Sequence, residues 1–147
     1  MRAHYFRHHA RGFTLIEIML VCAIMGLIAA MALPNYLRAR VSANEMVAIE
    51  VCRTLSTALE GYRAAQSPPA YPPDLAMLSN DLPPYLDSVV TRGTRQGYDY
   101  VYTRVNDNRY TVVGTPQTAT VTGVRSFFVD ESGVIRVGTD NTGVPIE

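Results

Sequence analysis

The sequence contains no lysine, and all 13 of its basic residues are arginines. This absence excludes Schiff-base catalysis and the phosphate-binding lysine of a P-loop. The two cysteines, Cys22 and Cys52, are too few for a disulfide framework and lack the C-x-x-C spacing of a zinc ribbon or a dithiol redox site. The three histidines all lie within the first nine residues, so the rest of the chain lacks the base of a His-dependent catalytic group. We therefore expect a protein that is not an enzyme and that has no cofactor.

The 13 acidic residues balance the arginines in number, but the two signs are distributed unevenly. Residues 1–12 contain three arginines and no acid, so this segment has a net charge of +3 and the remainder of the chain −3. His4, His8 and His9 lie in the same segment, and we interpret them as part of a basic leader rather than as metal ligands. A basic leader ahead of a membrane span favours a cytoplasmic N-terminus.

Residues 13–33 form an apolar run whose only polar side chains are Thr14 and Glu17. A helix of this length, at about 1.5 Å per residue, is about 31 Å long and can span the hydrocarbon core of a bilayer. A cleavable secretory signal is an alternative, because residues 29–32 (AAMA) resemble its small-residue cleavage site. The run is longer than the roughly 7–15 apolar residues of such signals, which favours a membrane segment.

The helical pattern continues beyond Pro34. Apolar residues spaced by four, three, four and three positions predict a buried stripe along one helix face: Ala48, Cys52, Leu55, Leu59 and Tyr62. Residues 66–84 hold six of the nine prolines, which predicts that the helix ends near Ala65. The sequence thus predicts one helix that is apolar over residues 13–33 and amphipathic over residues 34–65.

The apolar period changes to two after Gly97. This alternation predicts four short antiparallel strands in two hairpins, at residues 98–103, 109–113, 126–129 and 134–137. A small sheet needs cover on one face, and the stripe of the long helix is the candidate. We therefore expect an α+β fold in which residues 66–147 form a globular head, with a short helix near residues 74–78 and then the four-stranded sheet packed on the long helix.

A short motif at the start of the apolar run carries a family resemblance. Residues 12–18 (GFTLIEI) follow a basic leader and resemble the type III signal of type IV pilins and type II secretion pseudopilins. The resemblance implies that a prepilin peptidase cuts between Gly12 and Phe13 and methylates the new amine of Phe13. It also implies that Glu17 attracts the Phe13 amine of an incoming neighbour. An unpaired carboxylate at the centre of a span costs about 2.5–3.5 kcal/mol, so such a partner gives a physical reason for the acid.

The resemblance extends to the rest of the helix and weakens in the head. Gly26 and Pro34 lie where the family commonly has a helix-weakening glycine and proline, which implies that residues 26–34 are helical in the free subunit and can unwind in a filament. In the head, residues 91–93 (TRG) stand where major pseudopilins usually have an Asp-Pro-Trp-Gly turn. No cysteine follows Cys52, so the C-terminal disulfide of many type IV pilins cannot form.

Three groups of side chains in the head have the chemistry to bind a ligand: Tyr98, Tyr100 and Tyr102; Asp130, Glu131, Asp140 and Asn141; and Arg92, Arg95, Arg104 and Arg109. The tyrosines could stack on bases, but a strand row of this kind favours packing. The oxygen ligands could hold calcium, but their spacing matches no EF-hand and favours turns. The arginines could bind DNA, but the net negative charge of the head favours a solvated face. We expect no metal and no nucleic acid.

Together these features predict a structural subunit of a bacterial type IV filament, a type IV pilin, with the type IV pilin-like fold. The resemblance implies other copies of the chain, related minor pilins, the prepilin peptidase, an inner-membrane assembly platform and the lipid bilayer as partners. The precursor would lie in the inner membrane with its N-terminus in the cytoplasm, and the assembled filament would be periplasmic or extracellular. A major pseudopilin of a type II secretion system is the alternative within this class. A single-span membrane-anchored binding or sensor protein, with an uncut N-terminus, is the alternative from another class.

Overall fold

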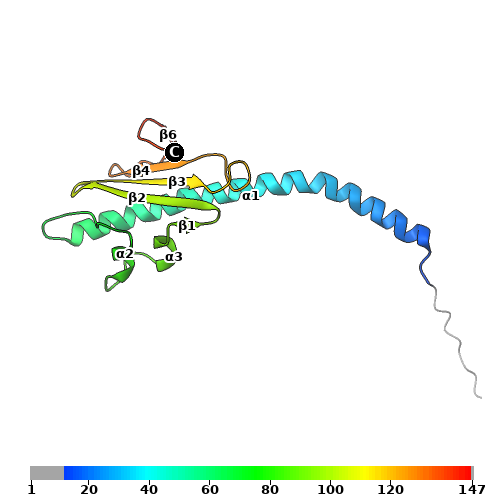
Figure 1. The fold of residues 1–147 in the computed structure, drawn as a ribbon, viewed down its shortest axis with the longest axis horizontal. Helices are drawn as coiled ribbons and strands as arrows, with labels where there is room; N and C mark the ends of the chain where they lie inside the picture. Colours follow the sequence, from blue (N-terminus) through cyan, green and yellow to red (C-terminus); the bar gives the residue numbers. More distant parts are fainter. Residues whose placement is uncertain (1–11, 147) are drawn as a thin grey trace, which may run out of the picture. The chain divides into compact units, whose positions relative to one another are not determined.

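The computed structural model describes residues 12–146 and divides the chain into two compact units, one up to Tyr36 and one from Leu37 onward. The interpretation of the leader histidines therefore lies outside the described residues. The helix α1 (Leu15–Ala65) runs through both units and ends at Ala65, where the proline-rich segment begins. The other elements belong to the second unit (Figure 1). The expected α+β class, a long N-terminal helix and an antiparallel sheet, is confirmed.

In the first unit, every described side chain is exposed. The part of α1 in this unit is long and apolar enough to cross a membrane by length and composition, and none of its most apolar stretch is buried. Gly26 and Pro34 both lie inside α1. The helix thus offers an apolar surface that is exposed among the described residues.

The second unit contains an antiparallel sheet in which every strand pairs with its neighbour in sequence, in the order β1-β2-β3-β4-β5-β6. The strands are β1 (Thr94–Arg95), β2 (Tyr98–Asn106), β3 (Arg109–Pro116), β4 (Phe127–Asp130), β5 (Arg136–Val137) and β6 (Val144–Pro145). Four strands were predicted, and the sheet has six. The two additional strands, β1 and β6, are two residues long and lie at the sheet edges, so they are too short to show an alternating pattern.

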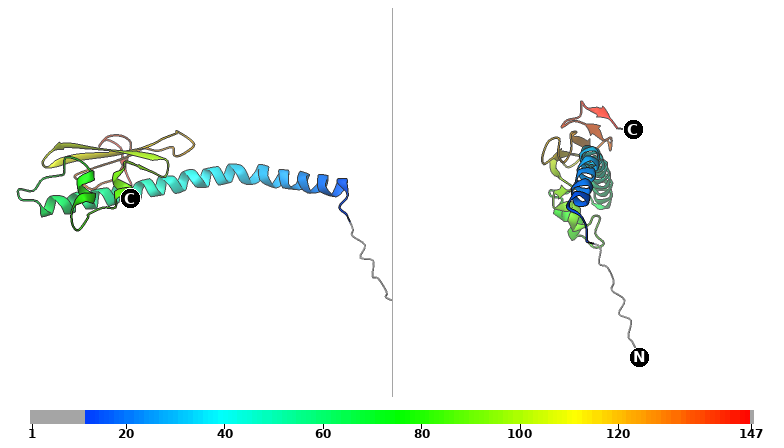
Figure 2. Two further views of the ribbon diagram at one scale, coloured as in Figure 1. Left: turned by 60° about the horizontal axis from the view of Figure 1, so that its bottom comes forward. Right: turned by 90° about the vertical axis from the view of Figure 1, so that its right-hand side faces the viewer.

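One face of the sheet packs on α1, and Figure 2 shows the two layers side by side. Four members of the predicted helix stripe are fully buried: Ala48, Cys52, Leu55 and Leu59. The fifth, Tyr62, is partly buried and packs against the core. The sheet contributes alternate residues of its central strands: Tyr98, Tyr110, Val112, Phe127 and Val129. The core of the head is therefore the contact between the amphipathic helix and the sheet. The apolar spacing of three to four residues in the helix and of two residues in the strands predicted this contact.

The segment between α1 and the sheet contains two short helices, α2 (Ala76–Asn80) and α3 (Ser88–Thr91). The first lies two residues later than the helix expected near residues 74–78, and the second was not predicted. Hydrogen bonds fasten this segment to the sheet: the Tyr71 amide donates to the Asp107 carbonyl at 3.0 Å, and the Tyr102 hydroxyl donates to the Pro72 carbonyl at 2.6 Å. The proline-rich segment is thus a packed part of the head.

Candidate assembly site at the start of the long helix

The first turn of α1 is closed by a reciprocal pair of side chains. The Glu17 amide donates to Thr14 Oγ1 at 3.3 Å, while the Thr14 amide and hydroxyl donate to Glu17 Oε2 at 2.8 Å and 2.7 Å. This arrangement is a capping box, which satisfies amide donors that the first helical turn leaves without partners. An acid at this position also interacts favourably with the positive end of the helix dipole. The carboxylate of Glu17 is therefore held in a defined orientation at the helix start.

The capping box leaves half of the Glu17 carboxylate available. Oε2 accepts both Thr14 bonds, while Oε1 has no hydrogen bond or ion pair within residues 12–146. Glu17 is exposed, and Phe13 is 84% exposed four positions before it. A cation from outside the chain can therefore reach a carboxylate that the helix already orients.

Glu17 is recognisable in the sequence as the unusual acid of the apolar run, but its pairing with Thr14 was not predicted. The signal was present, because Thr-x-x-Glu directly before an apolar helix is the pattern of a capping box. Glu17 thus has a role in the isolated chain, at its own helix start, which is separate from the intersubunit role that the resemblance implies.

No contact among residues 12–146 requires a glycine at position 26. A Cβ atom added to Gly26 would meet no heavy atom within 4 Å, and the same is true of Gly12. A glycine inside a helix costs about 1 kcal/mol relative to alanine. Since internal packing offers no reason for Gly26, the expected helix-weakening role of Gly26 and Pro34 stays a prediction about the assembled state.

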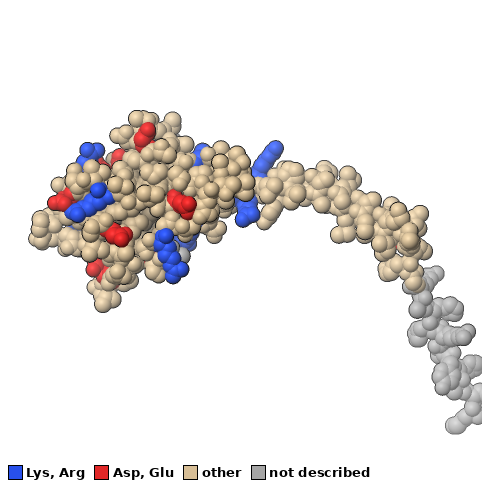
Figure 3. Space-filling view, in the orientation of Figure 1, with Lys and Arg blue, Asp and Glu red and all other residues tan. Residues whose placement is uncertain are grey.

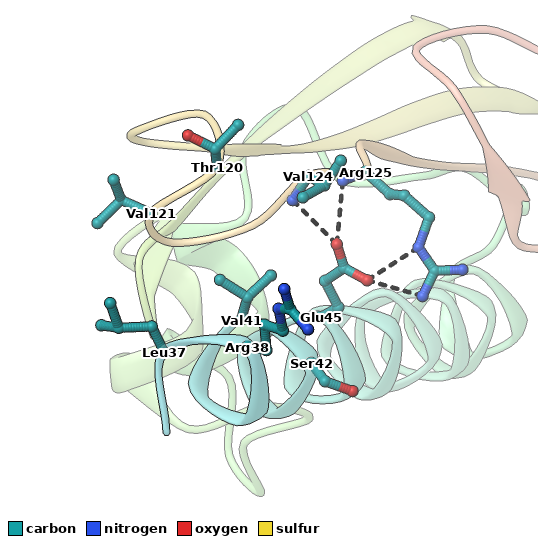
Figure 4. Close-up of a pocket in the computed structure, with 9 residues that line it drawn as sticks. All are labelled: Leu37, Arg38, Val41, Ser42, Glu45, Thr120, Val121, Val124 and Arg125. Atoms are coloured by element: carbon teal, nitrogen blue, oxygen red, sulfur yellow. Dashed lines mark hydrogen bonds and ion pairs between the residues drawn. The ribbon is translucent and has the colours of Figure 1, made fainter. Parts of the chain in front are cut away.

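The head contains a second organised carboxylate, Glu45, whose side chain is only 8% exposed. Glu45 Oε1 accepts the amides of Val124 and Arg125 at 2.9 Å and 3.1 Å (Figure 4). Its Oε2 pairs with Arg125 Nε and Nη2 at 2.8 Å and 2.7 Å. Burial raises the pKa of Glu45, but these bonds together outweigh burial and hold its pKa below the ordinary value. Glu45 therefore stabilises the segment between β3 and β4 against α1.

The neighbouring residue strengthens this junction, because Asn44 Nδ2 donates to the Thr122 carbonyl at 2.9 Å. Neither Asn44 nor Glu45 was predicted from the sequence to have a role. Their partners are 78 to 80 positions away in the sequence, so no local pattern identifies them.

Most of the candidate ligands in the head, namely the three tyrosines, the three acids and two of the four arginines, are engaged in packing, turns or ion pairs. Tyr98 and Tyr100 are buried in the core, and Tyr102 packs against it. The side chains of Asp130 and Asp140 accept hydrogen bonds from Ser132 and Thr142 within their own turns. Within the described part of the chain, no cluster of three or more His, Cys, Asp or Glu side chains could hold a metal ion.

Two of the four candidate arginines are paired with acids. Arg109 Nε lies 2.9 Å from Glu131 Oε1, and Arg104 pairs with Asp107. Arginines and acids alternate over the face of the head seen in Figure 3. This mixture lacks the single-sign patch expected of a nucleic-acid-binding surface.

Residues 7–33 match the family model of the prokaryotic N-terminal methylation motif. The Type IV major pilin protein PilA of Myxococcus xanthus is 39% identical over 62 residues, which are 42% of this chain and 28% of the relative. The Type IV wide pilus major component PilA4 of Thermus thermophilus is 51% identical over 39 residues, 26% and 30% of the two chains. The Type II secretion system core protein G of Klebsiella michiganensis is 36% identical over 61 residues, 42% and 43% of the two chains. No solved structure is significantly similar to the chain.

The chain spans less than half the length of these curated relatives. The matched motif includes Gly12, Phe13 and Glu17, together with the apolar part of α1. The resemblance of residues 12–18 to the pilin and pseudopilin signal is thereby confirmed. The motif and the long exposed apolar helix together indicate a membrane anchor.

Proposed function

We propose that this chain, which carries the N-terminal methylation motif of the type IV pilin and pseudopilin family, is a structural subunit of a type IV filament. The observation that carries the proposal is the exposed apolar helix that begins with an oriented, half-engaged Glu17 carboxylate. Such a helix needs apolar surroundings, first the bilayer and then the helices of neighbouring subunits. The proposed role is structural rather than enzymatic.

In this proposal the chain is made as a precursor in the inner membrane with its N-terminus in the cytoplasm. A prepilin peptidase removes residues 1–12 by cutting between Gly12 and Phe13 and methylates the new amine. An inner-membrane assembly platform then adds the subunit to other copies and to related minor pilins, in a periplasmic or extracellular filament. The basic leader ahead of the apolar run supports this orientation.

The pairing of Glu17 with the Phe13 amine of a neighbour would set the register of assembly. Opposite charges about 4 Å apart attract by about 4 kcal/mol at an effective dielectric constant of about 20. A subunit added out of register would leave both charges unpaired in apolar surroundings, where an unpaired charge is costly. The free Oε1 of Glu17 supports this role, because the carboxylate can accept the amine without breaking the capping box.

Two variants separate the charge of Glu17 from its capping role. Glu17→Gln keeps a capping-box side chain and removes the charge, so we expect membrane insertion with strongly reduced filament yield. Thr14→Ala weakens the cap by about 0.5–2 kcal/mol and keeps the charge, so we expect filaments to form. Filament yield is measured on sheared fractions and by electron microscopy. Wild-type yield from Glu17→Gln would refute the intersubunit pairing.

A major pseudopilin of a type II secretion system is the second candidate, because core protein G relatives are matched over a larger share of their own length than the first pilin. Deletion of the chain separates the two candidates: loss of long surface fibres supports a pilus, and loss of protein secretion without loss of fibres supports a pseudopilus. Mass spectrometry of the native protein tests the whole class. A chain that begins with N-methylated Phe13 supports a filament subunit, and one that begins at Met1 supports a membrane-anchored sensor.

A further inference from the structure

An open apolar groove lies at the end of the head that follows the membrane segment. One wall is the first part of α1 in the second unit, with Leu37 and Val41, and the other is the segment between β3 and β4, with Val121 and Val124 (Figure 4). The groove has a volume of about 460 Å³. Val121 and Val124 are 55% and 66% exposed, so their apolar surface is left to solvent by the head itself.

The groove is held open by bonds that do not involve its apolar side chains. The Glu45 carboxylate fixes the Val124 and Arg125 amides, and Asn44 fixes the Thr122 carbonyl. The segment between β3 and β4 is therefore already ordered before a ligand binds, which reduces the entropic cost of occupying the groove.

The sequence places this groove next to the bilayer. Leu37 follows Leu33, the last residue of the apolar run, by four positions, which span at most about 14 Å in any conformation and about 6 Å as a helix. The hydrocarbon core is about 30 Å thick and the whole bilayer about 40–45 Å, so each headgroup layer is roughly 5–7 Å deep. When residues 13–33 span the membrane, the groove begins at the level of the headgroups.

The charge at the groove matches an anionic headgroup. Arg38 lines the groove and has no ion pair or hydrogen bond among residues 12–146, whereas the charge of Arg125 is neutralised by Glu45. An exposed arginine at headgroup level is attracted to phosphate and to anionic lipids. A neighbour's apolar helix would not supply this partner, because residues 18–33 contain no charged side chain.

We propose that this groove binds an anionic phospholipid of the membrane in which the precursor is anchored. One acyl chain of this lipid leaves the hydrocarbon core and lies against Leu37, Val41, Val121 and Val124, and the phosphate lies against Arg38. The bound lipid holds the head on the membrane surface until the subunit is extracted. The inference rests on the proposed function only in requiring that residues 13–33 span a bilayer.

The chain has no tryptophan, so a single introduced tryptophan is an unambiguous fluorescent probe. We would reconstitute the full chain carrying Val121→Trp in nanodiscs of phosphatidylcholine, alone or mixed with phosphatidylglycerol brominated on its acyl chains. Val101→Trp is the matched control, because Val101 on β2 is 58% exposed and does not line the groove. Met25→Trp reports on the membrane span. We expect bromolipid quenching and a blue-shifted emission for Val121→Trp and Met25→Trp, and neither for Val101→Trp.

The charge of Arg38 is tested in the Val121→Trp background. Arg38→Gln should raise the fraction of brominated phosphatidylglycerol that gives half-maximal quenching by about fivefold, the effect of one arginine at an anionic surface. An unchanged fraction would overturn the phosphate contact. Val124→Trp repeats the experiment if Val121→Trp disturbs the far-UV circular dichroism.

The remaining outcomes each refute one statement. Quenching of Val121→Trp no stronger than that of Val101→Trp, with Met25→Trp quenched, refutes the lipid site and leaves the proposed filament function intact. Absence of quenching in Met25→Trp refutes the membrane span and with it the anchoring step of the proposed function. A blue shift of Val121→Trp without lipid quenching, seen only with two or more copies in a nanodisc, refutes the lipid and assigns the groove to a second copy of the chain.

Discussion

Replacing Glu45 by glutamine tests how the head is fastened to the helix. Glu45 is the only side chain that bonds both the Val124 and Arg125 amides and the Arg125 guanidinium within the described residues. Hydrogen bonds to charged groups contribute about 1.5–3 kcal/mol each, but Arg125 is half-exposed and its ion pair contributes about 0–1 kcal/mol. Glu45→Gln keeps an oxygen for the amides and loses the charge, so we expect the free energy of unfolding to fall by about 1–2 kcal/mol.

Glu45→Ala should cost more, about 2–4 kcal/mol, because two amides then lose their acceptor and a cavity is left beside them. These losses are large against a total stability of about 5–15 kcal/mol for a domain. The loss should concentrate in the segment between β3 and β4, where amide hydrogen exchange would accelerate first.

The effect of Glu45→Gln should also depend on pH. Because the pKa of Glu45 is lowered in the folded chain, its stabilisation is fully present above its unfolded value of about 4.3 and is lost as the pH falls through the lower folded value. The difference in unfolding free energy between wild type and Glu45→Gln should therefore be largest above about pH 5 and should shrink as the pH falls below that unfolded value.

The assay is urea unfolding of the full chain in detergent micelles, followed by the near-ultraviolet circular dichroism of the buried tyrosines. Glu50→Gln is the matched control, because Glu50 lies on the same helix and makes an exposed ion pair with Arg53 at 3.5 Å. We expect Glu50→Gln to change stability by less than about 0.5 kcal/mol. The interpretation of this junction would be refuted if Glu45→Gln had the same urea midpoint as Glu50→Gln. It would also be refuted if the difference in unfolding free energy between wild type and Glu45→Gln did not change with pH.

Three further predictions follow from the core of the head. Ser56→Ala should destabilise the head by about 1–3 kcal/mol, because the fully buried Tyr110 hydroxyl donates to Ser56 Oγ at 2.9 Å; adding Tyr110→Phe should recover part of the loss in urea unfolding. Gly123→Ala should lower the thermal midpoint markedly, because the new Cβ would lie 2.0 Å from the Tyr98 hydroxyl oxygen; a wild-type midpoint would contradict the close approach. Burial raises the pKa of Cys52 to about 12, so in a variant lacking the other cysteine, maleimide labelling at neutral pH should require opening of the head, and rapid labelling of the native state would contradict its burial.

Features with a local signal could be predicted from the sequence. The stripe of Ala48, Cys52, Leu55 and Leu59 depends only on helical spacing, and the end of α1 at Ala65 depends on the prolines that follow. The long strands were identifiable because alternation over several residues is a strong pattern. The two-residue strands β1 and β6 have no such pattern, because their pairing is decided by the strands beside them.

The candidate site was predictable in part for the same reason. The motif around Glu17 is contiguous in sequence, and even the unrecognised capping box spans only four residues, from Thr14 to Glu17. Glu45 looks like an ordinary acid of an amphipathic helix, because its partners come from the segment between β3 and β4. Its role becomes visible only when the fold brings that segment to the helix.

The two carboxylates on α1 show why only one of them suits assembly. Both oxygens of Glu45 are occupied, one by two amides and the other by the Arg125 guanidinium, and the side chain is buried. A partner from outside could reach Glu45 only by breaking bonds that hold the head together, at a cost that a new ion pair would have to exceed. Glu17 is exposed and uses one oxygen for its own helix start, so an incoming amine can bind the other oxygen without such a cost. An acid that is oriented but incompletely satisfied favours an intermolecular partner, whereas a fully satisfied acid stabilises the fold.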